Sequence, residues 1–237
     1  MSDSFNFQNG EVLLFDKPYG PTSFSIVNRV RGIIKRKLKV KNIKVGHAGT
    51  LDPLATGLLV ICTGKATKTI SSIQDAEKEY TGTITIGATT PSYDLETEVN
   101  ETFPTGHITD ELIHKTATEM AGEHHQMPPI FSAKQVDGKR AYDLARAGKD
   151  VKLNTKLVTI KEFEVTAIKK NAETIEVDFR VACSKGTYIR SLAYDFGRAV
   201  NSGGYLSSLR RTRIGKFNVE NAINADQFQV LLHGDQV

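Results

Sequence analysis

A glycine-rich loop that runs straight into an apolar segment is the feature that most constrains how this chain folds. The apolar run at 58–62 is typical of a strand buried in a core. The preceding loop, residues 46–57, contains three glycines, which allow tight or left-handed backbone and the close approach of a ligand. Its one acid is Asp52, and no other acid occurs between residues 17 and 74. We interpret Asp52 either as a nucleophile that faces a polyanion or as the cap of a turn in a structural loop.

The basic residues are unevenly distributed, although the net charge of +4 is modest. Residues 29–44 contain eight basic side chains and no acid. A second basic cluster lies near the end of the chain and consists of Arg210, Arg211, Arg213 and Lys216. Clusters of one sign in an otherwise balanced chain indicate a polyanionic partner. The alternative is that both clusters are solvated surface.

The composition is that of an ordinary globular protein, because 39% of the residues are hydrophobic and 24% are charged. No apolar run approaches the roughly 18–20 residues of a membrane span. The first residues are polar, so we expect no signal peptide. The two cysteines, Cys62 and Cys183, lie in apolar runs without a CxxC spacing. This pattern predicts buried free thiols and a cytoplasmic location.

Apolar periodicity predicts an α+β protein whose central sheet is mixed and largely antiparallel. We expect strands at about 11–17, 57–62, 79–86, 157–168, 173–183 and 212–219, and helices at about 22–34, 109–120, 140–147 and 188–200. Thr22 or Ser23 is expected to cap the first helix, and Gly148 to end the third. Residues 88–107 are expected to form a long polar loop.

Common catalytic arrangements are missing from the sequence. It has neither a GxSxG elbow nor a Walker-type GxxxxGK[ST] loop, and no second carboxylate lies near Asp52. The adjacent His124 and His125 would point apart, so we expect no metal site. What remains is chemistry by a single carboxylate, with neither metal nor cofactor. A phosphate hydrolase that uses His47 and Asp52 would need a metal cluster or a phosphate loop that the sequence lacks.

Five motifs closely resemble those of the bacterial tRNA pseudouridine-55 synthases, the TruB family. They occur in the family's order at 14–23 (LFDKPYGPTS), 46–57 (GHAGTLDPLATG), 78–80 (KEY), 126–133 (QMPPIFSA) and 183–190 (CSKGTYIR). The resemblance implies a single pseudouridine-synthase catalytic domain over 1–237, with a thumb-like insertion at about 124–150. Many members carry a C-terminal RNA-binding PUA domain. Because only about seventeen residues follow Glu220, we expect a short form without it.

The resemblance also implies roles for individual residues. Asp52 would be the nucleophile, Arg190 its cationic partner, and Tyr80 would stack on the target base and act near proton removal from carbon. His47 would insert into the T-loop in place of the extruded base, which lowers the cost of unstacking. The remaining substrate-binding residues implied by the resemblance are Asp94, Tyr188 and Lys17.

The implied activity is isomerisation of uridine 55 in the T-loop of tRNA to pseudouridine. Substrate and product are isomers, so neither ATP nor a redox cofactor is required, and the carboxylate can attack either the base ring or the sugar. We expect a monomer that binds the T-arm of tRNA, with no membrane and no obligatory protein partner. Two alternatives stay open: a non-catalytic tRNA-binding or tRNA-folding module, and the subunit of a guide-RNA-dependent pseudouridine synthase.

Overall fold

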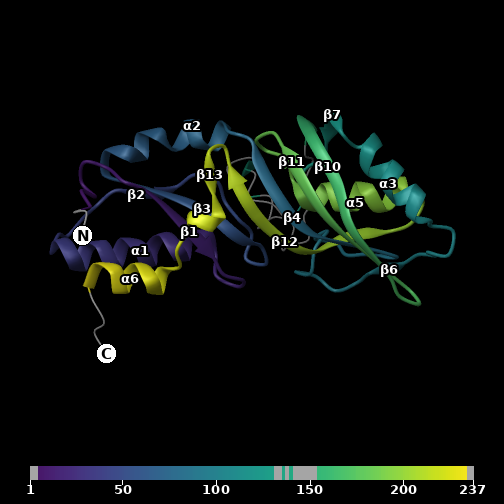
Figure 1. The fold of residues 1–237 in the computed structure, drawn as a ribbon, viewed down its shortest axis with the longest axis horizontal. Coiled ribbons are helices and arrows are strands. Elements are labelled where there is room, and N and C mark those ends of the chain that lie inside the picture. The colour runs from purple at the N-terminus through teal and green to yellow at the C-terminus, as the bar shows by residue number, and fades with distance from the viewer. Residues whose placement is uncertain (1–4, 131–134, 137–138, 141–153, 234–237) are drawn as a thin grey trace. The chain divides into compact units, whose positions relative to one another are not determined.

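The computed structural model describes residues 5–130, 135–136, 139–140 and 154–233 (Figure 1). The chain divides into two compact units. Unit 1 comprises Met1–Tyr80 and Arg210–Val237, and unit 2 comprises Thr81–Leu209. None of the helices in the described ranges is long and apolar enough to cross a membrane. The single catalytic domain stays a prediction, and much of its thumb-like insertion, namely 131–134, 137–138 and 141–150, lies outside the described residues.

The elements of unit 1 are β1 (Val12–Lys17), α1 (Ser23–Leu38), β2 (Val45–His47), β3 (Thr56–Thr63), the 3₁₀ helix η1 (Gly64–Thr69), α2 (Ile70–Asp75), β13 (Phe217–Asn218), the 3₁₀ helix η2 (Val219–Asn221) and α6 (Ala225–His233). Those of unit 2 are β5 (Ala88–Thr89), β6 (Glu101–Thr102), α3 (Asp110–Glu119), β7 (Gly122–Gln126), β8 (Gln135–Val136), β9 (Lys139–Arg140), β10 (Lys156–Lys170), β11 (Ile175–Cys183) and α5 (Ile189–Ala199). Two strands run through both units, β4 (Lys78–Ile86) and β12 (Gly204–Ile214).

Strand β3 is the centre of unit 1 and is buried on both faces. It pairs antiparallel with β1 and β2, and parallel with β12 through Arg210 and Arg211. Alternation sends Leu59 and Ile61 into one apolar cluster and Leu58, Val60 and Cys62 into another. This confirms the buried strand predicted from the apolar run. The Asp52 loop therefore leads into a strand that is packed on both faces.

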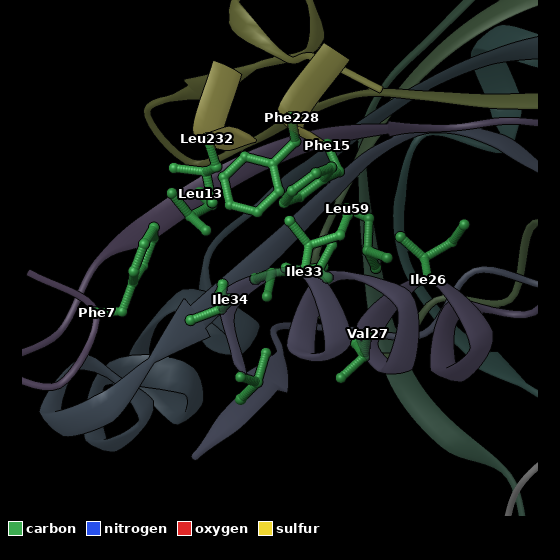
Figure 2. Packing of buried hydrophobic residues seen from close by; sticks show 13 residues of the cluster. Phe7, Leu13, Phe15, Ile26, Val27, Ile33, Ile34, Leu59, Phe228 and Leu232 are labelled. Atoms are coloured by element: carbon green, nitrogen blue, oxygen red, sulfur yellow. The ribbon is translucent and has the colours of Figure 1, made fainter. Parts of the chain in front are cut away.

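Helix α1 forms because a capped start precedes an apolar stripe. The Thr22 side chain accepts a hydrogen bond from the Ser25 N–H, and the helix ends at Lys39, whose φ is 54°. The buried stripe consists of Ile26, Val27, Val30, Ile33 and Ile34. It packs with side chains of β1, β3 and α6, as Figure 2 shows. At the centre of this cluster the rings of Phe15 and Phe228 meet edge to face, with centroids 5.3 Å apart.

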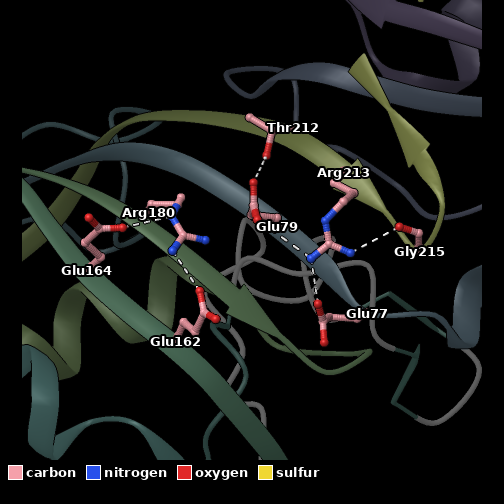
Figure 3. A network of polar contacts seen from close by, with 8 residues as sticks. All are labelled: Glu77, Glu79, Glu162, Glu164, Arg180, Thr212, Arg213 and Gly215. Atoms are coloured by element: carbon pink, nitrogen blue, oxygen red, sulfur yellow. Dashed lines mark hydrogen bonds and ion pairs between the residues drawn. The ribbon is translucent and has the colours of Figure 1, made fainter. Parts of the chain in front are cut away.

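Unit 2 is built on the antiparallel strands β10 and β11, and β10 also pairs antiparallel with β7. The inward residues of β11 are buried, as the alternation of 173–183 predicted. Helix α5 packs on this side through Phe196, whose ring lies 5.5 Å from that of Phe163. On the other side Arg180 binds the carboxylates of Glu162 and Glu164 (Figure 3). The α+β class with a mixed, largely antiparallel sheet flanked by helices is confirmed.

The structure also corrects several sequence-based expectations. The last strand, predicted at 212–219, begins at Gly204 and ends at Ile214, and the chain then turns at Gly215 into β13. The apolar pattern missed its first half because that half exposes Ser208 and has few apolar residues.

Helices α2 and α6 were not predicted, and the loop 88–107 contains the short pair β5 and β6. Arg140 ends β9, and the rest of the helix predicted at 140–147, with its cap at Gly148, lies outside the described residues. Cys62 and Cys183 are buried and free, as predicted.

Candidate active site

The Asp52 loop is tied down by hydrogen bonds immediately around the acid. The Asp52 carbonyl accepts from the Ala55 N–H at 3.1 Å, which closes a tight turn. Leu51, directly before the acid, has both of its backbone groups bound by one side chain. The hydroxyl of Ser23 accepts from the Leu51 N–H at 2.8 Å and donates to the Leu51 carbonyl at 2.9 Å. Asp52 itself is half-buried, so its carboxylate lies in a loop of defined shape.

Lys17 is a fully buried cation beside this turn. Its ammonium group donates to the carbonyls of Pro18, Pro53 and Ala55 at 2.8, 3.1 and 2.7 Å. Burial lowers the pKa of Lys17 to about 8, the charge of Asp52 opposes that shift, and the charge of Arg211 adds to it. Two of its three hydrogen bonds therefore hold the backbone of the Asp52 loop, at Pro53 and Ala55. The substrate contact implied by the resemblance stays a prediction.

Arg211 is a second buried cation that contacts the same loop, and it belongs to strand β12. Its guanidinium donates to the carbonyls of Leu58, Thr50 and Gly49 at 2.8, 3.4 and 3.0 Å. The residue is 1% exposed. The β12 backbone also presses against Gly57, where an added Cβ would lie 2.3 Å from the Arg211 carbonyl oxygen. The loop is thus held by cations from two elements.

His47 lies at the end of β2 and is half-buried. Burial lowers the pKa of His47, and the charge of Arg211 lowers it further, while a hydrogen bond with the Gly49 backbone raises it. The ring is therefore neutral at neutral pH. Within the described part of the chain, its Nδ1 is the one buried side-chain nitrogen or oxygen without a hydrogen-bond partner. Its insertion into RNA stays a prediction.

Tyr80 is the last residue of unit 1 on β4 and is 9% exposed. The residues before it are fixed by polar contacts that Figure 3 shows. Glu77 binds Arg213 at 2.6 Å, and Glu79 accepts a hydrogen bond from the Thr212 hydroxyl at 3.0 Å. These contacts hold this end of β4. The stacking and proton-transfer roles of Tyr80 stay predictions.

In unit 2 the structure brings together two of the predicted site residues, Arg190 and Asp94. The Arg190 Nε lies 3.6 Å from a carboxylate oxygen of Asp94, and each residue is 5% exposed. Arg190 also donates to the Ser92 carbonyl at 3.3 Å, and the Asp94 carboxylate accepts from the Glu96 N–H at 3.0 Å. This is a buried ion pair, and each of its members also hydrogen-bonds to the backbone. The pairing of Asp52 with Arg190 joins residues of different units and stays a prediction.

Tyr188 occupies the N-cap position of α5, two residues before Arg190, and its side chain makes no capping hydrogen bond. Its backbone is held by the side chain of Gln126, a residue to which the sequence analysis gave no role. The Gln126 amide accepts from the Tyr188 N–H at 2.7 Å and donates to its carbonyl at 3.0 Å. Ser191 donates to the Met127 carbonyl at 2.7 Å. The motif at 126–133 thus begins with residues that fix the start of α5. The available signal was that Gln126 is the first residue of this motif.

The two basic clusters differ in the structure. In the second, Arg210 binds Asp16 through two hydrogen bonds of 3.0 and 2.7 Å, Arg211 is buried, and Arg213 is paired with Glu77. Arg211 is too buried to bind a phosphate, so for this residue the predicted contact with a polyanion is wrong. For Arg210 and Arg213, which bind carboxylates of unit 1, it stays a prediction. In the first, Arg29 pairs with Asp226 and Arg31 donates to the Val45 carbonyl. Five other members are exposed, namely Arg36, Lys37, Lys39, Lys41 and Lys44.

Residues 35–189 match the family model described as TruB family pseudouridylate synthase (N terminal domain). A tRNA pseudouridine synthase B of Flavobacterium johnsoniae is 57% identical over 224 residues, which cover 94% of this chain and 96% of that protein. A tRNA pseudouridine synthase B of Phocaeicola vulgatus is 53% identical and covers 98% of this chain and 97% of its own length.

Among solved structures, a Cbf5-Nop10-Gar1 complex contains a chain with a TM-score of 0.69 and 29% identity, matched over 96% of this chain and 56% of that one. An H/ACA RNP bound to a substrate RNA containing 2'-deoxyuridine gives a TM-score of 0.65 and 28% identity, over 94% of this chain and 55% of that one. The family model covers more than half of the sequence, and the relatives match it nearly end to end. The chain belongs to the TruB family of pseudouridylate synthases.

Proposed function

We propose that this protein isomerises uridine 55 in the T-loop of tRNA to pseudouridine, with Asp52 as the nucleophile. The observation that carries the proposal is the construction of the Asp52 loop. Its backbone is bound from outside by Ser23, Lys17 and Arg211, each at most 2% exposed. A loop that only capped a turn would not need two buried cations, whose desolvation is costly. The names and high identity of the relatives support the same activity.

The reaction suits a single carboxylate. Asp52 attacks either the ribose or the base ring, the bond between the ribose carbon and the base nitrogen breaks, and the base turns while it is held in the pocket. A carbon–carbon bond then replaces the carbon–nitrogen bond, and a proton leaves that carbon of the base and another is gained at nitrogen. The atoms balance without a cofactor, because the product is an isomer. Tyr80 is the side chain proposed to stack on the base and to assist proton removal.

Substrate recognition is proposed to use the remaining site residues. Neutral His47 would occupy the space that the extruded uridine leaves, and Tyr188 and the Arg190–Asp94 pair would form part of the base pocket. The exposed basic side chains that end and follow α1 would bind phosphates of the T-arm. The protein would act on tRNA in the cytoplasm as a monomer, without a protein partner.

A guide-RNA-dependent role is the second candidate, because H/ACA assemblies occur among the similar structures. Their identity to this chain is 28–29%, against 57% for a relative named as a tRNA enzyme, so direct action on tRNA is favoured. A purely non-catalytic tRNA-binding or tRNA-folding module is disfavoured by the organised Asp52 loop.

The test is to incubate the purified protein with an unmodified tRNA transcript, without guide RNA or nucleotide, and to map pseudouridine. We expect modification at position 55. Asp52→Asn should abolish it and leave tRNA affinity within a few fold, because the amide is nearly isosteric but not nucleophilic. Turnover by a clean Asp52→Asn preparation would disprove the role of Asp52. Modification that required an added guide RNA would support the second candidate instead.

A further inference from the structure

Arg211 is a buried charge that the chemistry described above does not use directly. Its guanidinium reaches carbonyls on both sides of Asp52: those of Gly49 and Thr50 before the acid, and that of Leu58 after it. A charged side chain that is 1% exposed is costly to bury unless its donors are matched. Here they join the loop before Asp52 to the start of β3 after it. The arrangement suits a residue that fixes the loop's shape.

The loop needs such a restraint because it has a glycine near each end. Gly49 has φ of +106° and Gly57 has φ of +98°, values that only glycine adopts readily. Glycines give a backbone freedom that costs entropy to remove. Arg211 binds the carbonyl of Gly49 itself and that of Leu58, directly after Gly57. Its contacts thus lie beside both glycines.

We propose that Arg211 is a positioning residue for the reaction, which holds the Asp52 carboxylate in the orientation from which it attacks. This inference rests on the proposed function. Lys17 binds the carbonyls of Pro53 and Ala55, within the turn that follows the acid. The two cations therefore bind different parts of the backbone around Asp52. Lys17 binds the turn after the acid, and Arg211 binds the residues before that turn and after it. Only a planar guanidinium, with its several fixed donors, can bind on both sides of the turn at once.

The neighbouring Arg210 supplies a matched control. It lies on the same strand, one residue earlier, and its side chain binds the carboxylate of Asp16 and is 40% exposed. Adjacent residues on a strand point to opposite faces, so Arg210 does not reach the Asp52 loop carbonyls that bind Arg211. Arg210→Lys and Arg210→Gln should keep the rate of isomerisation.

The experiment compares Arg211→Lys, Arg211→Gln and the two Arg210 variants. It measures the single-turnover rate constant at saturating enzyme and, separately, the Kd for tRNA. We expect both Arg211 variants to lose about 100-fold in the rate constant, the scale of a misplacement of about 1 Å. Their Kd should match the wild type. A mere loss of folded protein would lower the active fraction but not the rate constant of the molecules that remain.

Three results would overturn the positioning role. The first is a normal rate constant in Arg211→Lys, and the second is a fall in tRNA affinity that accounts for the whole loss of activity. The third is the failure of both Arg211 variants to fold where Arg210→Gln folds, since Arg211 would then serve the fold rather than the orientation of Asp52. An inactive wild type would reject the proposed function itself, so the two failures are distinguishable.

Discussion

Replacing Ser23 by alanine should loosen the backbone directly before Asp52. The hydroxyl is 2% exposed and binds both backbone groups of Leu51, the residue directly before the nucleophile. Ser23→Ala leaves that N–H and that carbonyl in the interior without a partner. The oxygen removed is small, so surrounding side chains do not have to move to accommodate alanine. The loss is thus one of hydrogen bonding rather than of packing.

The size of the effect follows from the two hydrogen bonds. Each buried polar group left unpaired costs about 1–3 kcal/mol, so two cost about 2–6 kcal/mol. Alanine is a better helix former than serine by about 0.5 kcal/mol, which offsets a little of the loss at the start of α1. We therefore expect the free energy of unfolding to fall by about 2–5 kcal/mol. Against a typical stability of about 5–15 kcal/mol, this is easily measured.

The assay is urea denaturation followed by far-ultraviolet circular dichroism, since the chain contains no tryptophan. The matched control is Ser25→Ala in the same helical turn, where an exposed hydroxyl donates to the Thr22 carbonyl at 2.7 Å. Water replaces that bond, so the control should stay within about 0.5 kcal/mol of wild type. Single turnover of Ser23→Ala should be slower at unchanged tRNA affinity. Equal stabilities of the Ser23 and Ser25 variants would refute the reasoning.

Three further changes test other parts of the molecule. Arg190→Met removes the cation that faces the buried Asp94 carboxylate, so it should lower the free energy of unfolding by about 3–5 kcal/mol and abolish turnover. Arg190→Lys should recover part of both losses. An unchanged urea midpoint in Arg190→Met would show that the Arg190–Asp94 ion pair does not stabilise the fold. Because burial lowers the pKa of His47 below its ordinary 6.5, the unfolded chain binds that proton more readily, and wild-type stability should drop as the pH falls below 6.5. Thermal melts of His47→Gln should lack this part of the pH-dependent loss of stability. If the melting temperatures of wild type and His47→Gln change in parallel with pH, His47 does not contribute to that loss. A variant in which four basic side chains are neutralised together, Lys35, Arg36, Lys37 and Lys39, should depend less on salt when it binds tRNA. The slope of log Kd against log salt should fall by roughly 0.7–0.9 for each phosphate that these side chains bind, while the rate at saturating tRNA is unchanged. An unchanged slope would mean that this cluster is only solvated surface.

Local apolar patterns predicted those elements whose own side chains repeat with the period of a helix or a strand. Strand β11 has strict alternation and α1 has a capped apolar stripe, and both were predicted. Strand β12 was largely missed because its pairing partners, rather than its own side chains, specify it: Arg211 is a buried residue in a run that looks charged and exposed. Helix α6 was missed because its short span relies on Phe228 and Leu232, which become informative only once they join the α1 cluster. Tertiary contacts thus decided the elements that periodicity did not.

The candidate site divides in the same way. The glycines and the lone acid of the Asp52 loop are visible in sequence, because they are neighbours along the chain. The groups that restrain the loop are not, since the Lys17–Pro53 and Arg211–Leu58 bonds join residues 36 and 153 positions apart. One signal for Arg211 was present: consecutive arginines on a strand face opposite sides, so if one side of the strand is buried, one arginine is buried with it. A glycine-rich loop that must hold a nucleophile in place needs donors from outside itself, and buried cations on adjoining strands are the side chains that can supply several at once.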